Sequence, residues 1–330
     1  MKLGIGIACF WNFDKILRYA QISENYGMSE FWLEDNAFAR NPHELLALIG
    51  YFTKKIKIGV TTPISIRPPV VIARDMMTLD EIAPARVAVA IGLGTEKSTA
   101  TLKVGIETIK KVFEGHEIEY YNLKINVRRL QIDWPPYRKI PVYAAVNGLK
   151  NCEVAAEVAD GIHFAVMSAE YVGYVIDKIK KKRDVKDFRF LNHIVTFVSQ
   201  DYEEAQALAK SYVRPTFLHI PYVYKISGFS DDEIEAMKNW PREQLRAEEI
   251  INKLMMKSKV KPKDVEEPLL DKLASKFTLY GTPEDIVKRL KEYEQKGLDF
   301  MALTIFGPDI ESDIKILAKE VMPEFENNRK

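Results

Sequence analysis

Two acidic side chains of this 330-residue chain stand just after segments with the apolar character of strands. Asp35 and Asn36 end the segment E-F-W-L-E-D-N, and Glu96 follows the turn I-G-L-G at 91–94. A carboxylate in such a position can contact a polar group of a small molecule or handle a proton. The competing structural role for each is to cap a helix or to face solvent. Asp35 and Glu96 are therefore our candidates for catalytic carboxylates.

The segment K-I-K-I-G-V-T-T-P at 55–63 ends unusually for a buried strand. Apolar β-branched residues alternate with lysine, and Gly59 and Val60 then lead to two hydroxyls, Thr61 and Thr62, and a proline. Proline cannot donate a hydrogen bond to a sheet ladder. Small residues and a proline at this strand end indicate that something has to fit there.

Two glycine-containing turns point the same way. Gly92 and Gly94 lie in I-G-L-G and permit close approach of a ligand to the backbone. The segment A-A-V-N-G at 144–148 ends a strand and begins a helix, and amides at a helix N-terminus are a natural phosphate site. Small side chains and backbone amides suit a flat or extended cofactor better than a metal.

Metal and nucleophile chemistry find less support in the sequence. The five histidines form neither H-x-H nor H-E-x-x-H, and the chain has no G-x-S-x-G. His163 and His193 fall within predicted strands, where core histidines are the better explanation. Cys9 and Cys152 lie far apart and form no C-x-x-C, which favours a reducing compartment. We therefore predict no metal site.

An alternation of strand-like and helix-like segments would position these residues. Helix starts are marked by caps such as Asn41-Pro42 and Thr282-Pro283. Strands are expected at 2–8, 30–35, 55–61, 86–93, 140–146, 161–166, 190–199 and 300–306. Helices are expected at 13–26, 43–51, 69–82, 101–113, 149–159, 169–182, 202–213, 284–296 and 309–321.

Eight strand–helix units predict an α/β fold, a (β/α)8 TIM barrel in a single domain over residues 1–330. An open doubly wound sheet is the competitor, but the first turn, C-F-W-N at 9–12, lacks G-x-G-x-x-G. We expect a small insertion at about 115–136, before the fifth strand, and a helical insertion at about 216–275, after the seventh. Because barrel active sites lie at the C-terminal ends of the strands, this fold would bring the candidate residues together.

The bulk composition excludes several classes of partner. The chain is 47% hydrophobic and 29% charged, so we expect a sizeable core. Its formal net charge is +1, and the basic run K-I-K-K-K-R at 178–183 fits a solvated helix better than a nucleic-acid site. No run reaches 18 apolar residues, and the N-terminus lacks the features of a signal peptide. We expect a cytoplasmic protein with no nucleic-acid or membrane partner.

Six segments, in their order and spacing, resemble the bacterial-luciferase-like superfamily. Within it, the chain is similar to coenzyme F420-dependent oxidoreductases of the methylenetetrahydromethanopterin reductase type. The segments lie at 24–36, 56–69, 77–94, 140–148, 155–164 and 281–301. The chain departs from those reductases at Gly6 and Thr95, which stand where they carry acidic residues.

The resemblance implies an enzyme that transfers a hydride between the deazaflavin F420 and an organic substrate, usually as a homodimer. It also implies a cis peptide at Gly59-Val60 that backs the ring. We expect the insertion at 216–275, with Tyr222, Tyr224, Phe229 and Trp240, to roof the substrate, and the alternative for this insertion is a packing appendage. One alternative is an FMN-dependent monooxygenase that uses reduced flavin and oxygen, and another is a cofactor-free barrel with a binding or structural role. The predicted cofactor-binding residues are Asn36, Gly59, Val60, Thr61, Thr62, Gly92, Gly94, Ala145, Val146, Asn147 and Gly148.

Overall fold

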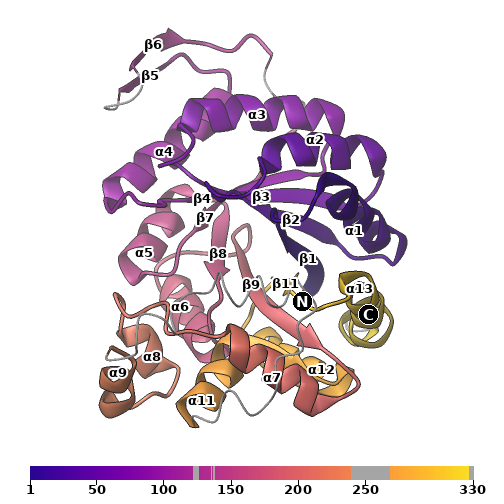
Figure 1. Cartoon of the computed structure of the whole chain (residues 1–330). Helices are drawn as coiled ribbons and strands as arrows, with labels where there is room; N and C mark the ends of the chain where they lie inside the picture. The colour runs from indigo at the N-terminus through magenta and orange to yellow at the C-terminus, as the bar shows by residue number, and fades with distance from the viewer. Residues whose placement is uncertain (122–125, 135, 137, 239–267, 327–330) are drawn as a thin grey trace. The chain divides into compact units, whose positions relative to one another are not determined.

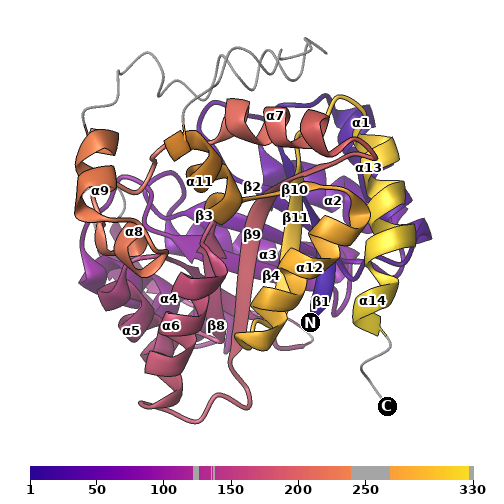
Figure 2. The ribbon, with the colours of Figure 1, turned by 90° about the horizontal axis from the view of Figure 1, so that it is seen from below.

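The computed structural model describes residues 1–121, 126–134, 136, 138–238 and 268–326. Its fold is the predicted (β/α)8 TIM barrel (Figures 1 and 2). Sheet neighbours follow the order β9-β11-β1-β2-β3-β4-β7-β8, β8 pairs again with β9, and β10 adds to β9. The strands are β1 (Lys2–Ala8), β2 (Glu30–Glu34), β3 (Lys57–Pro63), β4 (Val87–Gly92), β7 (Val142–Ala145), β8 (Gly161–Ala165), β9 (Arg189–Val198), β10 (Thr278–Gly281) and β11 (Phe300–Ile305).

The helices begin where the sequence supplies caps. The Asn12 side chain accepts a hydrogen bond from the Lys15 amide, and Thr282 forms a capping box with Asp285. Within the described part of the chain, no helix is both long and apolar enough to span a membrane. The helices are α1 (Phe13–Asn25), α2 (Pro42–Phe52), α3 (Pro69–Ile82), α4 (Thr99–Phe113), α5 (Leu149–Val158), α6 (Ala169–Lys180), α7 (Tyr202–Tyr212), α8 (Tyr222–Ile226), α9 (Asp231–Lys238), α11 (Pro268–Phe277), α12 (Pro283–Gln295), α13 (Ile310–Ile316), a π-helical turn (Leu317–Val321) and α14 (Pro323–Glu326).

The chain divides into two compact units, of which the first comprises Gly4–Phe164 and Ile179–Leu191. In this unit α1 to α4 lie along the outer side of β1 to β4 (Figure 1). Apolar side chains that alternate along the strands, such as Phe31, Leu33 and Val60, are buried. The small insertion before β7 forms an antiparallel hairpin of β5 (Ile118–Tyr121) and β6 (Asn126–Leu130). Every predicted site residue belongs to this unit.

The second unit comprises Met1–Leu3, Ala165–Lys178 and Asn192–Lys330. The Tyr293 hydroxyl donates to the Met167 carbonyl over 2.9 Å, which ties α12 to the end of β8. In the insertion after β9, Tyr224 and Phe229 are buried against Phe277 of α11, with ring centroids 5.4 and 6.1 Å from it. These two aromatic side chains therefore form a packing core. The rest of the insertion, 239–267, lies outside the described residues, and Trp240 with it.

Candidate active site

Contacts across the barrel identify which side chains of β2 face its interior. The Trp32 ring lies 4.7 Å from the ring of His163 on β8 and 6.2 Å from that of Tyr143 on β7. Neither β7 nor β8 is a neighbour of β2 in the sheet, so these contacts cross the interior. Because alternate residues of a strand face the same side, Glu30 and Glu34 face the interior as well.

The same reasoning orients β3. The Thr61 hydroxyl lies 3.4 Å from Nδ1 of His163, across the barrel. Thr61 pairs with Glu34 in the register of β2 and β3, and Gly59 pairs with Trp32. Thr61 and Gly59 therefore line the interior, whereas Val60 and Thr62 point to the opposite side of the sheet. Two of the four predicted site residues of this strand therefore face the interior of the barrel.

Packing against Trp32 explains why Gly59 is a glycine. A Cβ atom placed on Gly59 would lie 2.6 Å from two ring atoms of Trp32, far closer than van der Waals contact allows. Trp32 is 3% exposed, so its ring occupies the space beside Gly59. The small residue accommodates a side chain of the neighbouring strand.

The predicted cis peptide at Gly59-Val60 is wrong, because this bond is trans in the structure. The segment pairs without interruption on both sides: 57–61 with β2 and 58–63 with β4. A regular parallel ladder uses the trans geometry of ordinary extended backbone. The strand therefore shows no bulge at this point.

A network of hydrogen bonds that starts at Glu30, the first residue of β2, holds the Trp32 ring in place. Its Nε1 donates to Oε2 of Glu30 over 2.9 Å, and Nη2 of Arg189 donates to the other oxygen of Glu30 over 3.1 Å. Nη1 of Arg189 in turn donates to the Tyr143 hydroxyl over 3.0 Å. Glu30 is buried, and a buried carboxylate is tolerated because both oxygens are paired. The network holds the indole as a fixed floor within the barrel.

Small residues line the interior wall beyond this floor. In the register of β3 with β4, Ala90 pairs with Thr61 and Gly92 with Pro63. A Cβ atom on Gly92 would meet Ala145 of β7 only at 3.7 Å, an ordinary contact distance. The structure therefore brings Thr61, Gly92 and Ala145 together, and their small side chains leave room for a flat group. The sequence analysis predicted these three residues for the site because each lies near the C-terminal end of its strand.

Two helix N-termini meet beside this wall. α5 begins after its N-cap Gly148, which has no side chain with which to cap it, and α4 begins after Ser98. The Thr99 hydroxyl in the first turn of α4 donates to Oδ1 of Asn151 in the first turn of α5 over 2.9 Å. Helix N-termini carry partial positive charge and exposed amides, so this junction favours a phosphate. Val146 is buried, and Asn147 and Gly148 are half-buried at its edge.

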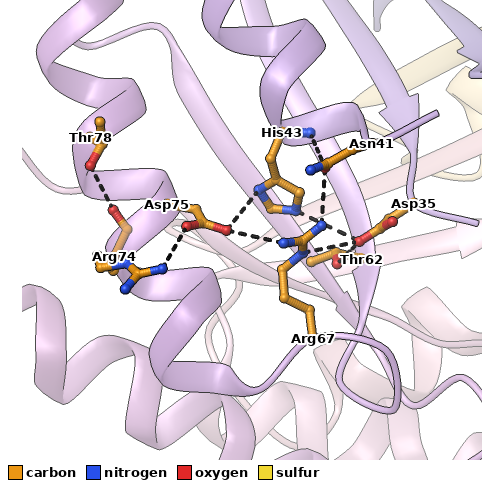
Figure 3. Close-up of polar contacts among 8 residues, drawn as sticks. All are labelled: Asp35, Asn41, His43, Thr62, Arg67, Arg74, Asp75 and Thr78. Atoms are coloured by element: carbon orange, nitrogen blue, oxygen red, sulfur yellow. Dashed lines mark hydrogen bonds and ion pairs between the residues drawn. The ribbon is translucent and has the colours of Figure 1, made fainter. Parts of the chain in front are cut away.

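Asp35 and Thr62 also come together, but on the outer side of the sheet. The Thr62 hydroxyl donates to Oδ2 of Asp35 over 2.6 Å, and Nε of Arg67 lies 3.4 Å from the same oxygen. Figure 3 shows Arg67 reaching from Asp35 to Asp75 of α3, whose Oδ2 lies 3.4 Å from its Nη1. We call Asp35, His43, Thr62, Arg67 and Asp75 the α2–α3 cluster. The side chain of Asp35 is 5% exposed, and its ion pairs belong to this cluster.

His43 lies inside the α2–α3 cluster, 3.8 Å from Oδ2 of Asp35 and 3.8 Å from Oδ2 of Asp75. Burial, with the nearby Arg67 charge, lowers the pKa of His43 to about 4, so the ring is neutral at pH 7. Burial raises the pKa of Asp75. Three members of the cluster, His43, Arg67 and Asp75, line a cleft of about 320 Å³ between α2 and α3. Among the described residues, no three His, Cys, Asp or Glu side chains gather as metal ligands would.

The other predicted residues lie on loops. The Asn36 side chain accepts a hydrogen bond from the Phe38 amide over 3.0 Å, which is an Asx turn, and Asn36 is exposed. Glu96 is exposed after β4, in a turn closed by its own amide and the Leu93 carbonyl. Gly94 adopts φ +65°, and a Cβ atom there would lie 2.0 Å from the Ser65 hydroxyl. Glycine at this position therefore allows the loop that carries Gly94 to pack against the loop that carries Ser65.

The sequence analysis missed Trp32, Glu34 and His163, which face the interior. The available signal is the alternation in E-F-W-L-E at 30–34, in which buried Phe31 and Leu33 mark the outer side. That pattern places Glu34 inside and sends Asp35 to the opposite side. For His163, no local pattern indicates the contact with Thr61, because the two strands meet only across the barrel.

The sequence is similar to that of proteins with known activities over nearly its whole length. It is 24% identical over 349 residues to 5,10-methylenetetrahydromethanopterin reductase of Archaeoglobus fulgidus, covering 98% of this chain and 99% of the relative. It is 22% identical to F420-dependent glucose-6-phosphate dehydrogenase of Microbacterium testaceum, covering 94% and 93%. The structure of the F420-dependent tetrahydromethanopterin reductase from Methanopyrus kandleri superposes with a TM-score of 0.73 at 20% identity, covering 98% and 99%. A family model for luciferase-like monooxygenases matches residues 8–299, and the chain belongs to that family.

Proposed function

We propose that this protein is an oxidoreductase that transfers a hydride between coenzyme F420 and a small organic substrate. The observation that carries this proposal is the wall of Thr61, Gly92 and Ala145 beside the paired N-termini of α4 and α5. A flat ring with a phosphate-bearing tail needs these two surfaces side by side. The two relatives named above as F420-dependent, a sugar-phosphate dehydrogenase and a pterin reductase, support the choice of cofactor.

The residues present fit such a cofactor. The ring would lie against the small side chains of β3, β4 and β7, with Thr61 available as a hydrogen-bond partner. The phosphate would be bound at the N-terminus of α5, next to Asn147 and Gly148. When bound, the deazaflavin supplies a hydride donor or acceptor at its C5 carbon. The protein orients the reactants, and the Trp32 floor excludes water from below.

The competing function is that of an FMN-dependent monooxygenase, the activity in the family's description. Deazaflavin and flavin rings have nearly the same outline, so a wall of small residues accepts both. Their chemistry differs, because reaction with oxygen requires the N5 atom that the deazaflavin replaces by carbon. A cofactor-free protein with a binding or structural role is the third possibility, and it predicts that neither cofactor binds.

We also propose a homodimer that uses the outer surface of α2. Leu48, Tyr51 and Phe52 are exposed on this helix, at 42%, 66% and 50%. Adjacent exposed apolar side chains on one helix favour association with another protein surface. Light scattering at micromolar concentration tests this proposal: a mass near twice 37.9 kDa supports it, and a mass near 37.9 kDa contradicts it.

The test of function compares the two cofactors directly. Purified protein is titrated with F420 and with FMN, and binding is followed by the fluorescence of each cofactor. Reduced F420 and, in a separate assay, reduced FMN are then supplied with candidate carbonyl and imine substrates while oxygen uptake is recorded. Hydride transfer from F420 without oxygen uptake supports the proposal. Selective FMN binding with oxygen uptake supports the monooxygenase, and binding of neither cofactor supports the cofactor-free alternative.

A further inference from the structure

We infer that Glu34 is the acid–base residue of this site, and that it exchanges the proton that accompanies hydride transfer. This inference rests on the proposed function. Three acidic residues stand near the strand ends that would surround a bound ring: Glu34, Asp35 and Glu96. The geometry distinguishes them.

Glu34 faces the interior at the C-terminal end of its strand. It is two residues beyond Trp32, whose ring contacts His163 and Tyr143 across the barrel. A side chain two positions on lies on the same face and about 6–7 Å nearer the mouth. Glu34 is the last residue of β2, so its carboxyl stands at the rim, above the indole.

The two residues that pair with Glu34 in the sheet have small side chains. In the sheet register Glu34 pairs with Ala8 on one side and with Thr61 on the other. Both are small, and Thr61 belongs to the wall assigned to the ring. Glu34 is half-buried, so solvent can exchange its proton while the site still limits the access of water. A carboxyl between the proposed cofactor wall and solvent has the position that proton transfer requires.

The two other carboxylates are worse placed. Asp35 points to the outer side of the sheet, where the Thr62 hydroxyl and the Arg67 guanidinium bind it. Arg67 lies in the loop before α3 and also pairs with Asp75 of that helix, so the ion pair of Asp35 serves the packing of the loops after β2 and β3 against α3. Glu96 is exposed on the loop after β4 and is not part of the barrel wall. Of these three residues, Glu34 is thus the one that both faces the interior and lies at the rim.

The chemical step balances with Glu34 as the acid. In the direction of substrate reduction, the carbon of a C=O or C=N bond accepts the hydride. The electron pair of the π bond takes a proton from the Glu34 carboxyl, which is left as the carboxylate. The proton released on oxidation of the cofactor restores the carboxyl. Reduced cofactor and C=X therefore become oxidised cofactor and H–C–X–H, and Glu34 acts as the base in the reverse direction.

The test replaces Glu34 by Gln, which keeps size and shape but cannot donate or accept the proton. We expect kcat to fall by about 10²-fold or more and the pH dependence of kcat that reports this group to disappear. Glu34→Asp should keep part of the activity and the pH dependence. The matched control is Glu81→Gln on the exposed face of α3, which should behave as the wild type.

A readout that does not depend on turnover is the affinity for F420 as a function of pH. Glu34 would lie beside the bound ring, so its ionisation should change that affinity in the wild type, and the change should be absent in Glu34→Gln. Near-wild-type kcat and pH profiles in Glu34→Gln overturn the inference and leave the proposed function intact. Failure of the wild type to bind F420 refutes the proposed function, and the inference falls with it. If Glu34→Gln does not fold, Glu34→Asp with the full kcat of the wild type overturns the inference, because the shorter side chain should lose part of the activity.

Discussion

Gly59→Ala should destabilise the barrel because of the Trp32 ring. The added Cβ atom would lie 2.6 Å from ring atoms that need about 3.4 Å, so the indole has to move by about 0.8 Å. Overpacking of this kind costs about 1–3 kcal/mol. A displaced indole also weakens its hydrogen bond to Glu30, and a bond to a charged group contributes about 1.5–3 kcal/mol. Alanine regains about 0.4–1 kcal/mol by restricting the unfolded chain. The net loss should be about 2–4 kcal/mol.

Urea denaturation with a double-mutant cycle measures this loss. In a Trp32→Leu background the clash is absent, so Gly59→Ala should cost much less, with a coupling energy above about 1 kcal/mol. Gly92→Ala is the matched control, because its Cβ atom would find Ala145 at 3.7 Å, and it should change stability by less than about 1 kcal/mol. A loss below about 0.5 kcal/mol for Gly59→Ala, with no coupling to Trp32, would refute the packing explanation.

Three further predictions concern Gly92, Arg67 and Asp313. Gly92→Val should lower F420 affinity at least about tenfold, by filling the wall beside Ala145, while the urea midpoint stays near that of the wild type. Arg67→Met should cost about 2–3 kcal/mol in urea denaturation, because it removes the guanidinium that pairs with both Asp35 and Asp75 and leaves Asp35 with only the neutral Thr62 hydroxyl as its hydrogen-bond donor. Arg74→Met, at a side chain 61% exposed, should cost little. Burial, reinforced by Asp309 and Glu204, raises the pKa of Asp313 to about 8, so the folded state holds its proton more tightly than the unfolded state does. The contribution of Asp313 to the free energy of unfolding is therefore complete below about pH 4 and declines as the pH rises to 8. Asp313→Asn should accordingly stabilise the protein more at pH 8 than at pH 4 in urea denaturation. Equal effects of the substitution at both pH values would contradict this assignment.

Much of the fold could be predicted because its signals are local. Asn41-Pro42 and Thr282-Pro283 mark helix starts in the sequence, and both helices begin at the proline. The eight strands of the barrel fall on the eight apolar segments, with ends that differ by at most a few residues. Strand ends such as Thr61 and Gly92 could therefore be placed at the mouth from the sequence.

The side of the sheet that each side chain faces was harder to predict, because it alternates with every residue along a strand. Asp35 and Glu34 are adjacent in the sequence, yet one binds Arg67 outside the sheet and the other faces the interior. The role of Gly59 depends on Trp32, a residue 27 positions earlier in the chain. The contact between Thr61 and His163 joins strands that are not neighbours in the sheet. Such contacts appear only once the barrel closes.

The most direct test of the central claim is a parallel titration of the wild type and Gly92→Val with F420 and with FMN. The proposed function predicts saturable F420 binding by the wild type at a ratio of one per chain, much weaker binding by Gly92→Val, and hydride transfer without oxygen uptake. Selective binding of FMN with consumption of oxygen would contradict it, as would F420 affinity that is the same in both proteins.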